Sequence, residues 1–245
     1  MAYLYSSSTG TSDDGMVRTF LKSSWADARD GDTGSASLNN TRLTYGVQAY
    51  GVVNPRDGST IYGVSRSFFY FDTSSITSTV SSASIDIRGY VTSSGDAIAV
   101  KSTAFGGDGG TSLAAGDFDA IVGWSDGSSL AGSATVYGSQ ITSWSTSGYN
   151  DFTGTTDLKN DMKNNNCVII CIMNYTYDYL NSSPGTSGTF ATGVYYTEQS
   201  GTGLDPRIDY TLATGYANSV NGVASANIGK INGIATASIE KVNGI

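Results

Sequence analysis

The sequence predicts an all-β protein, an antiparallel jelly-roll β-sandwich followed by a C-terminal tail of extended, β-like repeats. Three observations carry this prediction. Asp outnumbers Glu by nineteen to two, Gly occurs 31 times, and at least eight apolar or alternating runs are separated by turn residues. Asp and Gly favour turns, whereas Glu favours helices. A jelly roll requires short strands in about this number, with turn signals between them.

The central feature of the sequence is the apolar run at 65–71, which predicts a buried strand. It contains four consecutive aromatic residues, which fill both faces of a pleated strand. Asp72 ends the run, and its carboxylate can accept from the backbone N–H groups of Ser74 or Ser75. Residues 83–91 then alternate apolar and polar, which predicts a half-buried antiparallel strand. We expect the two runs to form a strand–turn–strand pair at the centre of the fold.

The N-terminal part predicts an arm at 1–13, a first strand at 16–21 and a loop at 27–34. Three aspartates lie in that loop: Asp27, Asp30 and Asp32. Hard cations take several carboxylate oxygens, so a structural calcium ion is one interpretation. The alternative is an Asp/Gly turn network neutralised by Arg29, and the absence of EF-hand ligand spacing favours it. No other cofactor is expected.

The remaining elements follow the same pattern of runs and turns. A glycine loop at 106–110 lacks the Lys-Ser/Thr and strand–helix setting of a phosphate-binding loop, so it predicts a turn. Residues 144–152 predict a packed loop. The one expected helix is 156–163, with Leu158 and Met162 on one face. Further strands are expected at 44–50, 98–100, 118–124, 134–137, 167–173, 194–197 and 207–212.

Cys167 and Cys171 are the only cysteines, and they lie four residues apart in an apolar run. In a strand their Cα atoms are about 13 Å apart, roughly twice the distance that a disulfide bridges. We therefore expect buried, reduced thiols and folding in a reducing cytoplasm.

An eleven-residue repeat begins near the C-terminus, with units at 220–230 and 231–241 and a third opening at 242. Such a period can indicate a helical coil. Each unit, however, contains Asn-Gly, and Gly costs a helix about 1 kcal/mol. The extended interpretation, with Asn-Gly at turns, fits better. The apolar positions are Val220, Val223, Ile228, Ile231, Ile234, Ile239, Val242 and Ile245.

Two and a third repeats are too few to bury their own apolar face, since solenoids need about three or more. We expect the tail to pack on a partner: another copy of the chain, another protein of the same assembly, or its own sandwich. The alternative is a linker without a partner, which the regular apolar spacing argues against. The chain then divides into an arm (1–13), a sandwich (14–214) and an assembly tail (215–245).

Several of these runs together resemble a known family. The run Arg-Ser-Phe-Phe-x-Phe-Asp-Thr-Ser-Ser-Ile at 66–76, followed by Ala83-x-Ile85, is similar to DNRLRE-type domains. These are jelly-roll modules related to carbohydrate-binding modules and found in cell-surface and virion proteins. Residues 25–29 and the closing strand at 205–211 resemble structural proteins of marine bacteriophages, and so does the repeat tail. The resemblance covers 14–214, implies fold and virion location, and supplies no catalytic residue.

The amino-acid composition argues against several classes of function. The chain has no histidine, which removes Ser-His-Asp and Cys-His arrangements and the usual zinc and haem ligands. Aspartates are plentiful enough for a paired-carboxylate glycosidase, but no pair stands out. A net charge of −8 argues against nucleic-acid and anionic-membrane partners. We find neither a signal peptide nor a run approaching the ~18 apolar residues of a membrane span.

Two non-enzymatic functions are therefore predicted. The first is a bacteriophage virion structural protein, a decoration protein or fibre subunit, made in the bacterial cytoplasm. Its tail would bind other virion proteins or further copies of the chain. The second is a carbohydrate-binding module for a host or cell-surface glycan, with aromatic side chains that stack on sugar rings. The candidate stacking residues are Trp124, Tyr137, Trp144 and Tyr149. The two functions are compatible.

Overall fold

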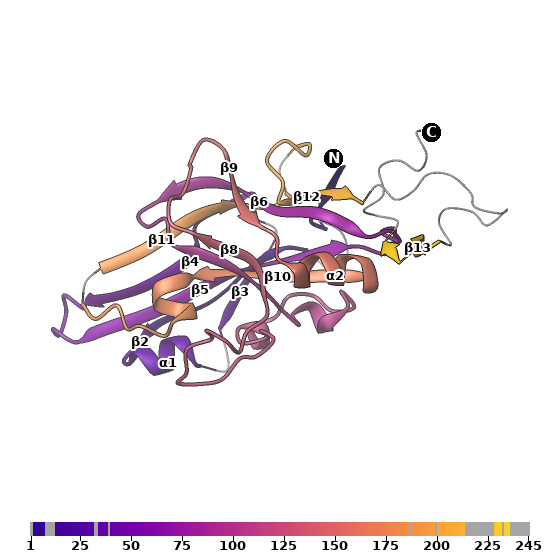
Figure 1. The fold of residues 1–245 in the computed structure, drawn as a ribbon. Helices are drawn as coiled ribbons and strands as arrows, with labels where there is room; N and C mark the ends of the chain where they lie inside the picture. The colour runs from indigo at the N-terminus through magenta and orange to yellow at the C-terminus, as the bar shows by residue number, and fades with distance from the viewer. Residues whose placement is uncertain are drawn as a thin grey trace.

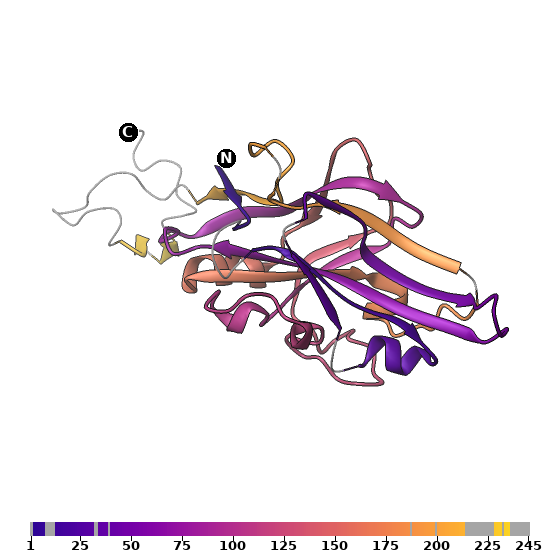
Figure 2. The same cartoon turned by 180° about the vertical axis from the view of Figure 1, so that it is seen from behind.

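The structure is a computed structural model that describes residues 2–7, 13–31, 34–38, 40–186, 188–198, 200–213, 228–231 and 233–235. Most of this part is strand, in one large antiparallel sheet that curls so that two halves face each other (Figures 1 and 2). The all-β prediction is confirmed. No helix in the described ranges is long and apolar enough to cross a membrane.

The main sheet contains twelve strands, and two helices flank it. The strands are β1 (Ala2–Tyr5), β2 (Gly15–Lys22), β3 (Ser35–Leu38), β4 (Arg42–Val53), β5 (Thr60–Asp72), β6 (Val80–Thr92), β7 (Ala97–Lys101), β8 (Val136–Ile141), β9 (Tyr149–Thr153), β10 (Cys167–Asn174), β11 (Gly188–Tyr195) and β12 (Arg207–Leu212). The helices are α1 (Trp25–Arg29) and α2 (Thr156–Asn164). Short turns of helix occur at η1 (Phe105–Gly107), η2 (Ala115–Asp117) and η3 (Tyr175–Tyr179).

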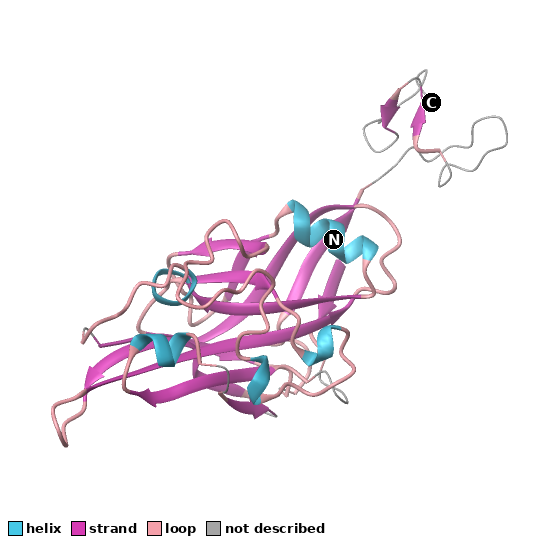
Figure 3. Ribbon diagram, turned by 90° about the horizontal axis from the view of Figure 1, so that it is seen from below, coloured by secondary structure: helices cyan, strands magenta, loops and turns pink. Residues whose placement is uncertain are grey.

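The strand order is β1-β12-β6-β11-β4-β5-β10-β7-β8, with β2 and β3 joined through β5 and with β9 joined to β6. Strand β5 is the hub of one half, because it pairs with β2, β4 and β10. Strand β6 is the hub of the other half, because it pairs with β9, β11 and β12. Figure 3 shows the short helices lying over the strands.

The expected central pair is wrong in its pairing, although both strands exist. Strands β5 and β6 share no ladder, and residues 73–79 carry the chain from one half of the sheet to the other. Phe69 and Phe71 meet Ile85 and Ile87 in one buried cluster. Both strands point apolar side chains at a common core, so they face each other across it. The Asp72 turn is confirmed, since its Oδ1 accepts from the Ser74 N–H at 2.9 Å.

Strand β10 is buried on both faces, as its unbroken apolar sequence predicts. Val168 and Ile170 face the inner core, whereas Ile169 and Cys171 face a second cluster on the other side of the sheet. The segment 102–134 covers that second cluster with side chains such as Phe118. Both cysteines are free. The helix predicted at 156–163 is confirmed as α2, with Leu158 and Met162 buried.

Four further expectations are wrong. Residues 2–5 form β1 rather than an arm, because Leu4 packs on the inner core and the strand pairs with β12. The loop expected from 27 begins inside α1, which Ser24 caps by accepting from the Asp27 N–H. Residues 118–124 form turns with one isolated bridge, from Ile121. The packed loop at 144–152 becomes strand from residue 149, where β9 pairs with β6.

Candidate functional site

The described part of the tail contains one small hairpin. Strands β13 (Lys230–Ile231) and β14 (Ile234–Ala235) pair antiparallel, with Ile231 opposite Ile234. The two-residue connection is the Asn-Gly of the second repeat, and its Gly233 has φ 83°. Such a turn requires positive φ, which Gly adopts at little cost. Residues 230–231 and 234–235 are extended, as predicted, and the rest of the unit at 231–241 lies largely outside the described residues.

The hairpin leaves apolar surface in water. Ile234 is 56% exposed. An isolated two-stranded hairpin is marginally stable at best in water, so these four residues gain most from a partner surface. Of the predicted assembly positions, Ile228, Ile231 and Ile234 lie within the described residues. Val220, Val223, Ile239, Val242 and Ile245 lie outside them.

A groove of about 300 Å³ lies where β4, β11 and β6 meet. Both ladders of β11 shift register between Thr192 and Val194. Three residues of β4 and two of β6 therefore stand opposite Gly193 alone. β-bulges of this kind re-aim side chains and are frequent beside binding sites. Here the groove contains two outward apolar side chains, Tyr45 and Val91, which are 47% and 36% exposed.

Most of the other lining residues carry hydroxyl groups. We call this groove the bulge groove, and it is lined by Thr44, Tyr45, Val91, Thr92, Ser93, Thr189 and Ala191. A Cβ added to Gly193 would stand 2.6 Å from Val91 Cγ1 and 2.9 Å from the Val91 backbone nitrogen. Only glycine fits there. An apolar floor with hydroxyl walls suits a ligand that has both a flat apolar face and hydroxyl groups.

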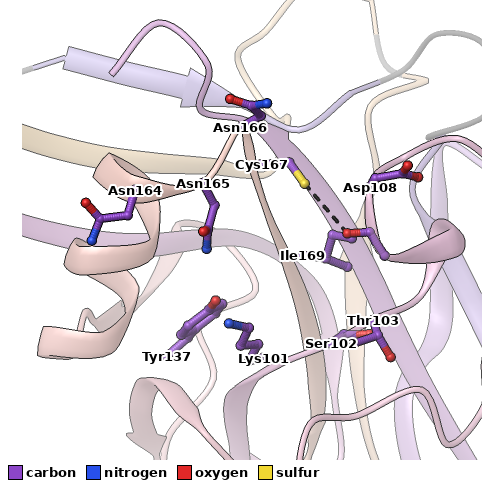
Figure 4. A pocket seen from close by; sticks show the side chains of 11 residues that line it. Lys101, Ser102, Thr103, Asp108, Tyr137, Asn164, Asn165, Asn166, Cys167 and Ile169 are labelled. Atoms are coloured by element: carbon purple, nitrogen blue, oxygen red, sulfur yellow. Dashed lines mark hydrogen bonds between the residues drawn. The ribbon is translucent and has the colours of Figure 1, made fainter. Parts of the chain in front are cut away.

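A larger pocket of about 470 Å³ lies between the C-terminal end of α2, the end of β7 and the start of β10 (Figure 4). Two charged residues line it, Lys101 and Asp108; Asp108 accepts from the Gly110 N–H at 2.8 Å, and Lys101 is paired with Asp161 of α2. Lys101 Nζ lies 2.8 Å from Asp161 Oδ2, and the Tyr137 hydroxyl donates to the same oxygen. Burial alone would raise the pKa of Asp161, but hydrogen bonds from Lys101 and Tyr137 hold it below its usual value.

The thiol of Cys167 opens into this pocket and contacts the Gly107 carbonyl oxygen at 3.9 Å (Figure 4). Burial raises the pKa of the thiol. Burial and the neighbouring thiol also raise the pKa of Tyr70 to about 12. Both groups stay protonated near neutral pH, so neither is an activated nucleophile. The pocket can accept a neutral polar ligand, and nothing in its described lining points to covalent chemistry.

The four predicted stacking residues do not form one platform. Tyr137 and Trp144 are buried in the inner core at 1% and 7% exposure, so stacking on a sugar is wrong for both. The Trp124 ring lies against two guanidinium groups and its Nε1 donates to Asp126. Tyr149 donates to the carbonyl oxygens of Gly203 and Asp205 on the outer face of the sheet.

The aspartates proposed for calcium have other environments. Asp27 is exposed in the first turn of α1, and Asp30 pairs with Arg29 and accepts from the Gly127 N–H. Asp32 lies outside the described residues. Within the part of the chain that the structure describes, no three His, Cys, Asp or Glu side chains are grouped to hold a metal ion.

A buried, balanced charge network lies beneath segment 102–134, and sequence reasoning missed it. We call it the arginine network: Arg29, Arg66, Asp178 and Asp30. Arg66 makes a bidentate pair with Asp178, with both N–O distances 2.7 Å. Arg29 Nε donates to the Asp178 backbone oxygen at 2.7 Å, and its Nη1 pairs with Asp30. Both arginines are fully buried.

A second group consists only of acids, of which Asp14 and Asp205 are buried and the other two half-buried, and we call it the acid cluster: Asp13, Asp14, Glu198 and Asp205. Asp14 accepts from the Thr197 hydroxyl at 2.9 Å. One buried oxygen on each of the other three carboxylates has no hydrogen-bond partner. None of the ion pairs among the described residues involves any member.

The acid cluster has perturbed proton affinities. Burial, and next the nearby Glu198 carboxylate, raise the pKa of Asp14 well above its usual value. Burial likewise raises the pKa of Glu198, and it raises that of Asp205 to about 6. Uncompensated burial disfavours the charged carboxylate, so these groups bind protons more readily than exposed acids do.

Comparison of the sequence with protein-family models and with curated proteins found no match. The function is therefore argued from the residues and their geometry.

Proposed function

We propose that the protein is a non-enzymatic structural component of a bacteriophage virion, a decoration protein or fibre subunit. Its curled sheet would be a jelly roll displayed on the particle. The C-terminal repeats would hold it there by packing on other virion proteins or on further copies of the chain. The observation that carries the proposal is the hairpin at 230–235, which places two isoleucines opposite each other and leaves Ile234 mostly exposed.

Three further observations support this proposal. The charged fraction of the chain is 14%, against an average of about 25%. Its surface polarity therefore comes largely from Ser, Thr, Asn and Gly. Both cysteines are free, which fits a protein assembled in a reducing cytoplasm. The sequence of the repeats places β-branched residues at regular spacing, and such residues suit pairing with another strand.

The experiment compares the full chain with a chain lacking residues 215–245. We expect the deletion to lower the oligomeric mass measured by light scattering and to abolish incorporation into particles. A double variant, Ile231→Ser with Ile234→Ser, should have the same effect, whereas Lys230→Ser should not. Unchanged assembly of the truncated chain would contradict the proposal.

The second candidate function is glycan binding, and the bulge groove favours it. Sugar rings combine an apolar face with hydroxyl groups, which matches Tyr45 and Val91 beside the hydroxyls of Thr44 and Thr189. A virion protein that binds host glycan would use both surfaces. Retention of the tail-less sandwich on a glycan array tests this function without any contribution from the repeats.

A further inference from the structure

Beside the bulge groove lies an arginine held in place by two tyrosines. The Arg42 guanidinium carbon stands 4.1 Å from the Tyr90 ring centroid and 5.9 Å from that of Tyr195. The two rings meet edge to face at 5.6 Å. Arg42 Nη1 also donates to the Tyr195 hydroxyl at 3.3 Å. These contacts fix the guanidinium in position, so less entropy is lost when it binds a ligand.

This stack lies next to the groove on the same sheet surface. Arg42 pairs with Tyr195 in the β4–β11 ladder, and the extra residues of the register shift lie in β4 and β6 rather than in β11. Tyr195 therefore points to the same side of the sheet as Ala191 and Thr189, which line the groove. Tyr90, on which the guanidinium stacks, directly precedes Val91 of the groove, so a ligand seated there lies beside the guanidinium.

Arg42 has no acidic partner among the described residues. The ion pairs there use Arg29, Arg66, Lys101 and Arg207 as cations, and Arg42 is absent from them. An exposed guanidinium positioned by neutral groups can offer two parallel N–H donors to a carboxylate. We propose that the bulge groove binds a saccharide residue that carries a carboxylate, such as a uronic acid. Tyr45 and Val91 would contact the sugar ring, and Arg42 would bind the carboxylate.

This inference rests on the glycan-binding candidate and specifies its ligand class. The long-range field of the protein opposes anions, since the net charge is −8. Recognition of the carboxylate would therefore depend on the two N–H donors of the Arg42 guanidinium rather than on a basic surface. Binding of a single charged sugar is expected to weaken at high salt, because one exposed ion pair is screened.

The test uses the full chain and two matched probes, trigalacturonate and its fully methyl-esterified form, by isothermal titration calorimetry. We expect trigalacturonate to bind at least ~10-fold more tightly than the ester, the usual worth of a charge-assisted bidentate contact. Arg42→Gln should remove this preference. Arg56→Gln, which changes an exposed loop arginine away from the groove, should keep it. An unchanged melting temperature checks that each variant folds.

The outcomes separate this inference from the proposals on which it rests. If the ester binds as well as the acid, and Tyr45→Ala abolishes both, the groove binds glycan but the acidic ligand class is overturned. If neither probe binds and a glycan array shows retention of neutral sugars only, the inference is again overturned. Binding that Arg42→Gln leaves intact would overturn the role of Arg42. None of these results bears on assembly through the tail.

Discussion

The arginine network and the acid cluster both contain buried charged residues, yet their charges are arranged in opposite ways. In the network two arginines meet two aspartates, and Asp178 accepts from Arg66 through both carboxylate oxygens. In the acid cluster four carboxylates meet no cation among the described residues. A buried charge is tolerated when it is paired and hydrogen-bonded, and otherwise its proton equilibrium shifts. The contribution of the arginine network to stability therefore depends on how its partners are placed, whereas the contribution of the acid cluster depends on pH.

The network also joins segments that are far apart in the sequence. Arg66 Nη1 donates to the Phe118 carbonyl oxygen and Arg29 Nη2 to that of Ser128, at 2.5 and 2.8 Å. The Arg66 guanidinium lies 3.9 Å from the Phe118 ring centroid. These contacts attach the long segment 102–134 to the outer side of β5. A segment with little secondary structure is thereby held by hydrogen bonds from two side chains.

The largest expected effect comes from removing the shared acid of the network. Asp178→Asn leaves two buried guanidinium groups short of a carboxylate, and breaking such a pair costs about 3–5 kcal/mol. Urea unfolding should show this loss as a lower midpoint. Asp57→Asn, in an exposed loop, is the matched control. A loss below about 1 kcal/mol would mean that the network contributes little to stability.

The acid cluster predicts an unusual pH dependence of stability. The raised pKa values of Asp14, Glu198 and Asp205 mean that these carboxyls bind protons more tightly in the folded than in the unfolded chain, so protonation favours folding. This contribution to stability is complete below the pKa of about 4 that the group has in the unfolded chain. It is lost as the pH rises through the pKa of Asp205 in the folded chain, about 6. Between about pH 7 and pH 5 the protonation of Asp205 should raise the free energy of unfolding by about 1 kcal/mol. Thermal melts across that range measure it, and a flat or falling profile would contradict it.

Neutralising one member of the acid cluster should act in the same direction at fixed pH. Asp205→Asn removes a charge that is costly to bury, so we expect stabilisation of about 1 kcal/mol at pH 7, after allowance for solvent screening. The same variant should flatten the pH profile. The opposite signs expected for Asp178→Asn and Asp205→Asn form the sharpest test of the comparison. Destabilisation by Asp205→Asn would show that its charge is compensated in solution.

The smallest effect is expected at a third pair of intermediate burial. Arg207 Nε lies 3.1 Å from Asp86 Oδ2, with the arginine side chain 20% exposed. The guanidinium also stands 4.1 Å from the ring centroids of Tyr3 and Tyr149. Arg207→Gln should cost no more than about 1 kcal/mol, and added salt should reduce the difference. A salt-independent loss of stability as large as that of Asp178→Asn would show that this pair behaves as a buried ion pair.

The local sequence pattern was sufficient to predict those elements whose signal lies within a few residues. The apolar run of β10, the capped start of α2 and the Asn-Gly turn of the tail each contain their own explanation. Pairing was not predictable in this way. Strands β5 and β6 have the right alternation for a hairpin, yet they belong to opposite halves of the sheet. Alternation reports which face is buried, and it carries no information about which strand lies alongside.

The sites were less predictable than the strands. The members of the arginine network stand at positions 29, 30, 66 and 178. Arginine and aspartate are mostly exposed residues, so no local signal marks these as part of a buried network. The bulge groove depends on register shifts in two ladders at once. Its one signal in the sequence is Gly193 inside a strand, because an isolated strand glycine indicates a bulge or a close backbone approach. The aromatic residues chosen from composition alone were partly core residues.

Strand β1 pairs with β12 along its whole length, from Ala2 opposite Tyr210 to Tyr5 opposite Arg207. The beginning and the end of the sandwich are therefore neighbours on one edge (Figure 1). Linking these two ends and opening the chain at the exposed loop 54–59 should give a circular permutant that keeps the same core. A domain fused ahead of Ala2 would emerge beside the C-terminal end of β12, so the loop at 54–59 is the better attachment point for a fusion that must leave that edge open.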